Sequence, residues 1–207
     1  MKELLERYPT LATVSGEIEK AKNAIVKCYE NGGKLLICGN GGSSADSDHI
    51  VGELMKGFLK KRPLTSEKKA ELKARFPEMD EETLDKLQGA LPAISLSSFS
   101  ALNTAFSNDV DPELVFAQAL LGLGRVGDVL IAISTSGNSK NAFAAAKLAK
   151  ALGMTLISLT GMGGGKLGTI SDICIAVPEK ETYKVQELHL PVYHWLCAKV
   201  EEYFFSE

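Results

Sequence analysis

The chain has few cysteines and no long apolar run. Its four cysteines form no C-x-x-C pair, so neither a disulfide framework nor a cysteine zinc site is indicated, and their apolar surroundings predict buried thiols. No apolar run approaches the ~20 residues of a membrane span, and the charged N-terminus lacks the apolar centre of a signal peptide. We therefore expect a cytoplasmic protein with no membrane partner. The cysteines are Cys28, Cys38, Cys174 and Cys197.

A surplus of positive charge is also missing. Lys and Arg number 23 against 26 Asp and Glu, which gives a net charge of −3, so nucleic acid is not an indicated partner. Hydrophobic residues make up 45% of the chain and charged residues 24%, as in ordinary soluble globular proteins. A length of 207 residues suits one domain with a sizeable core, and we expect a single domain over 1–207.

The sequence does contain a glycine-rich turn, CGNGGSS, between an apolar run at 34–38 and a segment with helical spacing. Glycine lets the backbone turn with positive φ and lets an anion approach closely. The free N–H groups and the dipole of a helix N-terminus favour phosphate. Asn40, Gly41, Gly42 and Ser43 are therefore candidate substrate-binding residues.

Two nucleotide-binding motifs do not fit this turn. The dinucleotide fingerprint G-x-G-x-x-G needs a glycine where Ser44 stands, and the Gly-Lys-Ser/Thr of a P-loop is absent. A strand-to-helix turn without a ligand remains an alternative. Beyond the turn, His49 and Glu53 are spaced i, i+4, so they lie on the same side of the predicted helix.

A second turn, STSGNS, follows the apolar run at 128–133 and precedes an alanine-rich segment. It supplies four hydroxyl groups, those of Ser134, Thr135, Ser136 and Ser139, at the start of a predicted helix. Capping a helix needs only one such side chain, so four indicate a site for a phosphomonoester. We expect the phosphate to lie between this turn and Ser43.

Apolar runs alternate with segments of helical periodicity. Strands that are apolar throughout and separated by helices are typical of a parallel sheet covered on both faces. The sequence therefore predicts an α/β three-layer sandwich with a central parallel sheet of about five strands and with helical N- and C-terminal segments. The predicted strands are 34–38, 91–96, 128–133, 154–159 and 173–177, and the predicted helices are 11–31, 43–58, 115–123, 141–152 and 182–205.

The segment at about 59–89 has a different composition. It is dense in Lys, Glu and Arg, and Pro63 and Pro77 divide it. This pattern predicts a charged helical insert that projects into solvent. A mobile lid over the site is the alternative.

The last predicted helix combines polar and apolar signals. Gln186 and His194 are two turns apart and can line one face, while His189 is either a core residue or a third member of the site. Pro191 should kink or restart the helix. The apolar surface exceeds what packing on a sheet requires, which predicts a homo-oligomer. Its residues are Leu188, Leu190, Val192, Trp195, Leu196, Val200, Tyr203 and Phe204.

These motifs together carry a resemblance that spans about 11–205 apart from the insert. The chain resembles the SIS (sugar isomerase) domain family, which has a flavodoxin-like fold, and within it the phosphoheptose isomerases. The motifs are GNGGS at 39–43, D-x-x-H-x-x-x-E from Asp46, GDVLIAISTSGNS at 127–139, TLISLTG at 155–161 and Q-E-x-H-x-x-x-x-H from Gln186.

The resemblance implies a phosphosugar aldose–ketose isomerase, similar to those acting on sedoheptulose 7-phosphate, with Glu53 and His194 as the acid–base pair. It further implies that His49, Glu53, Gln186 and His194 can hold Zn2+, that Gln186 and Ser98 contact the phosphorylated sugar, and that the oligomer is a tetramer. Ser98 stands where the heptose isomerases carry an acidic residue. Because part of the SIS family does no chemistry, a non-catalytic domain that binds a phosphosugar or a protein is the alternative.

Overall fold

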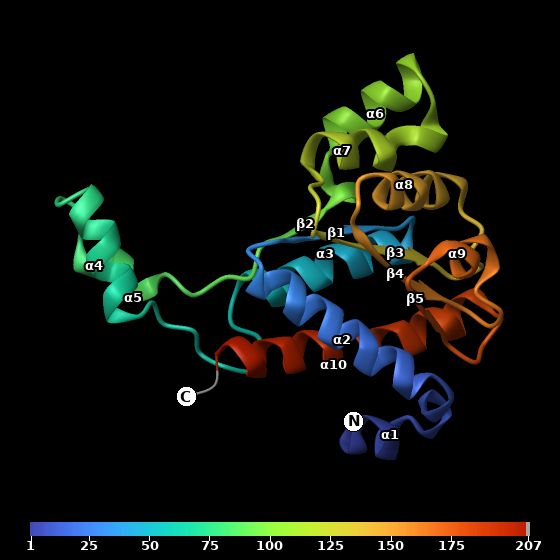
Figure 1. Cartoon of the computed structure of the whole chain (residues 1–207), viewed down its shortest axis with the longest axis horizontal. Helices are drawn as coiled ribbons and strands as arrows, with labels where there is room; N and C mark the ends of the chain where they lie inside the picture. The colour runs from blue at the N-terminus through green and yellow to red at the C-terminus, as the bar shows by residue number, and fades with distance from the viewer. Residues whose placement is uncertain (206–207) are drawn as a thin grey trace.

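The structure, a computed structural model, describes residues 1–205, and in that range five parallel strands form one sheet of order β2-β1-β3-β4-β5. Helices cover both faces of the sheet (Figure 1). The predicted α/β three-layer sandwich with a central parallel sheet is confirmed. The strands are β1 (Leu35–Cys38), β2 (Ala93–Ser95), β3 (Val129–Ser134), β4 (Thr155–Thr160) and β5 (Ile173–Ala176).

Successive side chains of a strand point to opposite faces of the sheet, and each face has its own hydrophobic core. In β1, Leu35 and Ile37 point into one core, whereas Leu36 and Cys38 point into the other. The first core holds helices α2 (Ser15–Glu30), α3 (Gly42–Met55) and α10 (Thr182–Phe204) against the sheet. The second core holds α7 (Val115–Leu123), α8 (Lys140–Ala151) and α9 (Gly165–Ile170).

Local sequence explains where the covering helices lie and end. The fully buried residues of α8 are all alanines, Ala142, Ala145, Ala146 and Ala149, which lets this helix approach the sheet closely. Just beyond its end, Gly153 has φ +72°, a left-handed conformation that glycine adopts without strain. The chain begins with the short helix α1 (Lys2–Arg7) and the 3-10 helix η1 (Pro9–Val14), which precede α2.

The strand order creates a switch point in the middle of the sheet. From β1 the chain moves to β2 on one side and then to β3 on the other. Ligands of open parallel sheets bind outside the carboxyl ends of the strands at such a point. The turns that follow β1 and β3 are the two turns for which phosphate binding is predicted.

Helices α3 and α10 run side by side in the same direction. Gly42 at the start of α3 lies against Gln186 near the start of α10, and His49, two turns on, contacts Tyr193. The sequence separation within each pair is the same, so the two helices advance in step. Of the two outcomes predicted at Pro191, a kink or a restart, the restart is wrong, because α10 continues through Pro191 as one helix. The kink stays a prediction. Proline has no N–H to donate to the carbonyl of Glu187, four residues earlier. Glu187 is exposed, so water can donate to this carbonyl instead.

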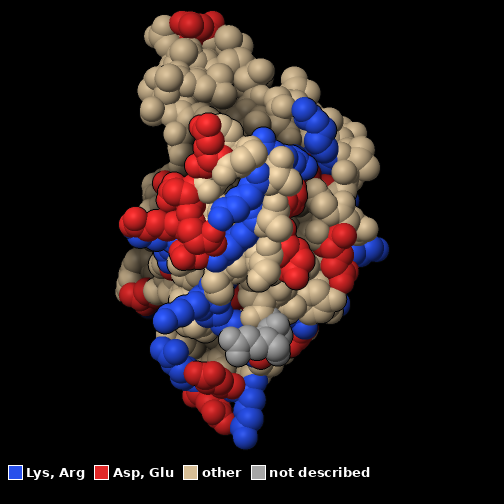
Figure 2. Space-filling model, turned by 90° about the vertical axis from the view of Figure 1, so that its left-hand side faces the viewer, with Lys and Arg blue, Asp and Glu red and all other residues tan. Residues whose placement is uncertain are grey.

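The charged insert forms a helical hairpin that projects from the body (Figure 1). Its helices are α4 (Ser66–Arg75) and α5 (Glu81–Lys86), which begin at capping residues Thr65 and Asp80. Acidic and basic side chains are interspersed on the face of the molecule seen in Figure 2. Most residues of α4 and α5 are exposed or half-buried. The solvated excursion and the alternative of a lid both stay predictions.

Within residues 1–205, the sequence patterns miss the short helices α1 and α9 and the longer helix α6 (Ser100–Asp109). Helix α6 has no fully buried residue, so it lacks the apolar repeat that predicts a helix. Two 3-10 turns flank it, η2 (Leu96–Ser98) and η3 (Pro112–Leu114). Among residues 1–205, none of the helices combines the length and the apolar character that crossing a membrane needs.

Candidate active site

The glycine turn after β1 has no room for side chains at two of its positions. A Cβ on Gly39 would lie 2.5 Å from the carbonyl oxygen of Ser43, and one on Gly42 would lie 2.3 Å from Nε2 of Gln186. Gly41 has φ +57°, which positions it as the residue before α3. Position 39 therefore needs glycine, because the clash there is with backbone, whereas at position 42 the clash is with the flexible end of Gln186. The carboxamide of Gln186 lies at the N-terminus of α3.

The turn after β3 is ordered by its own hydroxyls. Oγ of Ser134 lies 2.9 Å from Oγ of Ser139, and Oγ of Ser136 accepts a hydrogen bond from the N–H of Asn138. Gly137 has φ +66°, and a Cβ there would lie 2.0 Å from the carbonyl oxygen of Gly164 in the loop after β4. The four predicted hydroxyl residues thus converge at one helix start.

A pair of amides ties the two turns together. Asn40 and Asn141 exchange two hydrogen bonds of 2.9 Å between their carboxamides. Asn141 was missed at the sequence level because it looks like an ordinary residue of the first turn of α8. Ser98, at the carboxyl end of the neighbouring strand β2, is exposed and donates to Asp48 on α3. All the predicted phosphate-binding residues therefore lie at the carboxyl edge of the sheet.

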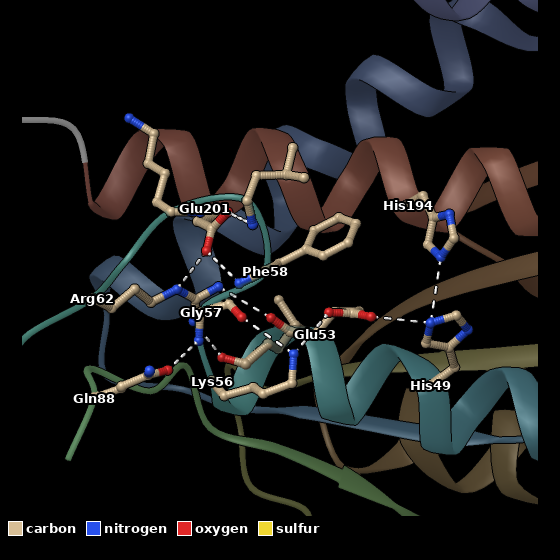
Figure 3. Close-up of polar contacts among 12 residues, drawn as sticks. His49, Glu53, Lys56, Gly57, Phe58, Arg62, Gln88, His194 and Glu201 are labelled. Atoms are coloured by element: carbon tan, nitrogen blue, oxygen red, sulfur yellow. Dashed lines mark hydrogen bonds and ion pairs between the residues drawn. The ribbon is translucent and has the colours of Figure 1, made fainter. Parts of the chain in front are cut away.

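Further along α3, three titratable side chains meet. Nε2 of His49 lies 3.0 Å from Oε1 of Glu53 and 3.5 Å from Nε2 of His194. Each of the three residues offers one possible metal-binding atom, and these three atoms lie within 4.8 Å of one another. Figure 3 shows the three side chains pointing toward one another, two from α3 and one from α10. The structure thus brings together three of the four predicted zinc ligands and both predicted catalytic residues.

The surroundings of the cluster adjust its charges. Burial and the neighbouring His49 lower the pKa of His194, and Glu53 opposes them only in part. Lys56 places its Nζ 3.4 Å from Oε2 of Glu53, and the ring of Phe58 lies against His194. His194 is therefore a neutral imidazole near pH 7, able to accept a proton beside a carboxylate.

Comparisons with known proteins agree with this layout. A model of the SIS domain family matches residues 1–87 and 87–161. The phosphoheptose isomerase of Akkermansia muciniphila is 34% identical over 203 residues, which cover 98% of this chain and 94% of that protein. The one from Helicobacter pylori is 38% identical, with 98% and 91% covered. A solved phosphoheptose isomerase from Neisseria gonorrhoeae gives a TM-score of 0.76 at 30% identity, with 97% and 94% covered.

The chain belongs to the SIS domain family, among the phosphoheptose isomerases. The predicted family and the predicted class of enzyme, an isomerase, are thereby confirmed. For a phosphoheptose isomerase, the two turns and the His–Glu–His cluster are the two parts of one candidate site. Helix α3 links them, because it begins at the glycine turn and carries His49 and Glu53.

The donor atoms of the cluster fit a zinc ion in this isomerase. Atoms bound to tetrahedral zinc at 2.0–2.2 Å lie about 3.3–3.5 Å apart. The distances of 3.0 Å between His49 and Glu53 and 3.5 Å between the two imidazoles are close to that value, and the three donor atoms all lie within 4.8 Å of one another. Two imidazole nitrogens facing each other also need a shared cation or proton between them. His49, Glu53 and His194 therefore suit zinc by both donor type and spacing.

Gln186, the predicted fourth ligand, lies elsewhere in this structure. Its carboxamide packs on Gly42, whereas His49 is seven residues, or about 10 Å, further along α3. This position suits contact with the substrate near the glycine turn. Its role as a zinc ligand stays a prediction.

His189 is a core residue of the isomerase. It is fully buried, and its Nε2 lies 3.2 Å from the carbonyl oxygen of Thr160, so Nε2 carries the proton in the neutral ring. Burial lowers its pKa to about 4, against a usual value near 6.5. Of the three histidines, the two on exposed or half-buried positions form the cluster and the third is structural.

His189 should make the fold sensitive to acid. Because its folded pKa is below its unfolded value, the unfolded chain takes up the proton first as pH falls below about 6.5, and stability drops by up to about 3 kcal/mol by pH 4. Above pH 6.5 this contribution to pH dependence vanishes. Urea unfolding of wild type and His189→Gln at pH 7 and pH 4.5 measures it. We expect the wild type to lose more stability than the variant, and equal losses would contradict the assignment.

A buried ion pair locks the chain just after α3. Nε of Arg62 donates to Oε1 of Glu201 at 2.8 Å, and both side chains are buried. The same guanidinium donates to the carbonyl oxygens of Glu53 and Leu54 in the last turn of α3 (Figure 3). Arg62 was not singled out from the sequence, because it stands at the edge of a segment full of solvated charges.

Proposed function

We propose that the chain interconverts sedoheptulose 7-phosphate and the corresponding aldoheptose 7-phosphate. The observation that carries this proposal is that His194 of α10 meets His49 and Glu53 on α3, the helix whose N-terminus follows the glycine turn predicted to bind phosphate. The relatives that match nearly the whole chain are named phosphoheptose isomerases, which supports a seven-carbon substrate.

The substrate would bind with its phosphate between the two hydroxyl-rich turns. The backbone N–H groups at the starts of α3 and α8 and the hydroxyls of Ser134, Thr135, Ser136 and Ser139 supply donors without a metal. The sugar chain would then extend along α3 toward His49, about two turns from Gly42. Phosphate at one end thus leaves the carbonyl end free to reach the acid–base pair.

The reaction requires a proton to move between two adjacent carbons. Glu53 takes the proton from C1 of the ketose, an enediol forms, and the proton returns at C2 to give the aldose. His194, neutral near pH 7, moves the hydroxyl proton between O1 and O2. The two residues face a common point, so either assignment of their roles uses the same geometry.

We propose zinc as the cofactor, held by His49, Glu53 and His194, with Gln186 as the predicted fourth ligand. When bound there, zinc would polarise the carbonyl and hydroxyl oxygens of the sugar.

A panel of sugar phosphates tests this function directly. The protein, with and without added Zn2+, is incubated with C5, C6 and C7 ketose phosphates, and products are read by NMR. Conversion of the C7 compound above the others supports the proposal. Conversion of a shorter sugar alone would change the substrate, and no conversion of any compound would favour a non-catalytic phosphosugar-binding domain.

The phosphate cradle leads to a prediction about binding. Ser136→Ala and Ser139→Ala should each weaken binding of the sugar phosphate, because each removes a hydroxyl from the turn after β3, while the melting temperature stays nearly unchanged. Isothermal titration with sedoheptulose 7-phosphate and thermal unfolding measure the two effects. Unaltered affinity in both variants would rule out a phosphate site at this turn.

Assembly into a homotetramer is also proposed. Val192, Leu196 and Val200 are buried in the chain's own core, so α10 has less exposed apolar surface than its sequence suggests. Leu190 and Tyr203 stay exposed, and a groove beside His194 is lined by Tyr8, Leu190, Pro191 and Trp195, among others. Light scattering at micromolar concentration should give four times the chain mass of 22.2 kDa, and a monomer would refute the proposal.

A further inference from the structure

The hydroxyl of Tyr193 lies between an acid and one of the cluster histidines. It is 3.1 Å from Oδ1 of Asp46 and 3.0 Å from Nδ1 of His49. Asp46 and His49 are one turn apart on α3, and Tyr193 approaches both from α10. Because His49 turns its Nδ1 to the tyrosine, its other nitrogen, Nε2, faces Glu53 and His194.

The number of available hydrogens decides which group donates in each of these contacts. A tyrosine hydroxyl has one hydrogen to donate, and an ionised carboxylate can only accept. The Tyr193 hydrogen therefore goes to Asp46, and the oxygen of Tyr193 accepts from Nδ1–H of His49. Oδ2 of Asp46 is buried and has no hydrogen-bond partner among residues 1–205, so Tyr193 is the donor on which this carboxylate depends.

We infer that Asp46 and Tyr193 are positioning residues that hold a proton on Nδ1 of His49 and so turn its Nε2 toward the cluster. Tyr193 is buried and acts through His49. The inference rests on the proposed function in one respect, since Nε2 is the atom that would bind zinc. Outer partners of this kind fix the tautomer and the ring orientation of a metal-binding histidine.

The packing of Tyr193 makes the hydroxyl separable from the rest of the side chain. Tyr193 is 2% exposed, and its ring meets those of His49 and His194 edge to face at centroid distances of 5.5 and 5.0 Å. Phenylalanine keeps the ring and loses only the oxygen. Tyr29→Phe is the matched control, because Tyr29 is also buried and its hydroxyl donates to the carbonyl of Pro92, away from the cluster.

The first measurement is the affinity for Zn2+, obtained by competition with a chromophoric chelator. Tyr193→Phe should bind Zn2+ about 10–100-fold more weakly than wild type, the usual effect of removing such an outer partner, while Tyr29→Phe should bind as wild type does. Equal affinities in wild type and Tyr193→Phe, with zinc bound by both, would overturn the inference.

The second measurement needs neither zinc nor turnover. Two-bond proton–nitrogen NMR spectra of the metal-free protein at pH 8 report which ring nitrogen of each histidine is protonated, and three histidines are few enough to assign by variants. Nδ1 of His49 should be protonated in wild type. In Tyr193→Phe, Nδ1 should lose its proton, because the carboxylate of Glu53 at Nε2 is the acceptor left to the ring.

A second variant reaches the same contact from the other side. In Asp46→Ala the hydroxyl of Tyr193 is free to donate to Nδ1 of His49, so Nδ1 should lose its proton even though the tyrosine remains. An unprotonated Nδ1 in wild type, or a protonated one in both variants, would overturn the inference. A protein that isomerises no sugar phosphate but shows the proton shift would refute the proposed function alone.

Discussion

Glu53→Gln and His194→Gln should each lower turnover of the sugar phosphate by about 10²–10⁴-fold, the usual contribution of a positioned acid or base. Glutamine keeps the shape of Glu53 but cannot take a proton, and at position 194 it cannot shuttle one. Binding of the sugar phosphate should be retained, because the phosphate cradle lies at the N-terminus of α3, about 16 Å from Glu53. Loss of kcat without loss of affinity is therefore the expected signature.

The zinc set gives these two variants a second readout. If His49, Glu53 and His194 hold the metal, both substitutions should weaken Zn2+ binding as well as turnover. Glu82→Gln, which neutralises an exposed carboxylate of α5, is the control and should change neither quantity. Turnover at the wild-type rate in either Glu53→Gln or His194→Gln would show that the acid–base pair lies elsewhere.

The fold was predictable from sequence wherever the signal is local. The apolar run at 34–38 and the glycines after it predict a strand and a turn, and β1 and α3 begin within one residue of the predicted positions. Alanines at helical spacing do the same for α8. Helix α6 was not predicted because it has no fully buried residue, although Phe106 packs against the second core. Whether α10 can pass through Pro191 depends on whether the carbonyl left without its N–H partner is near solvent.

The site divides in a similar way. His49 and Glu53 are neighbours on any helix, since four residues separate them, so their pairing needs no tertiary information. Their meeting with His194 depends on α3 and α10 running in parallel and in step, which only family resemblance could supply. Tyr193 carries no motif of its own, and its role appears only when its hydroxyl is found between Asp46 and His49.

Arg62→Met should lower the free energy of unfolding by about 3–5 kcal/mol, because it leaves the buried carboxylate of Glu201 without its partner. Two carbonyl groups at the end of α3 would lose a donor at the same time. Lys86→Met in the exposed pair with Glu82 is the matched control, and it should cost less than about 1 kcal/mol. Urea unfolding at pH 7 measures both.

A double variant, Arg62→Met combined with Glu201→Gln, separates the ion pair from the other contacts of Glu201. Oxygens of Glu201 also accept from the backbone N–H groups of Phe58, Leu59 and Lys60. Burial raises the pKa of Glu201, but the N–H groups of Phe58 and Leu59 together with Arg62 outweigh it and hold the pKa below its usual value, so the carboxylate is ionised at pH 7.

Glu201→Gln removes that charge and keeps an oxygen acceptor for the backbone. Arg62→Met combined with Glu201→Gln should therefore be less destabilised than the sum of the two single variants, because no unpaired charge is left in the interior. The lost donors to Glu53 and Leu54 should still keep the double variant below wild type. Strict additivity of the two substitutions would mean that the ion pair itself contributes nothing and that Arg62 acts only by capping α3.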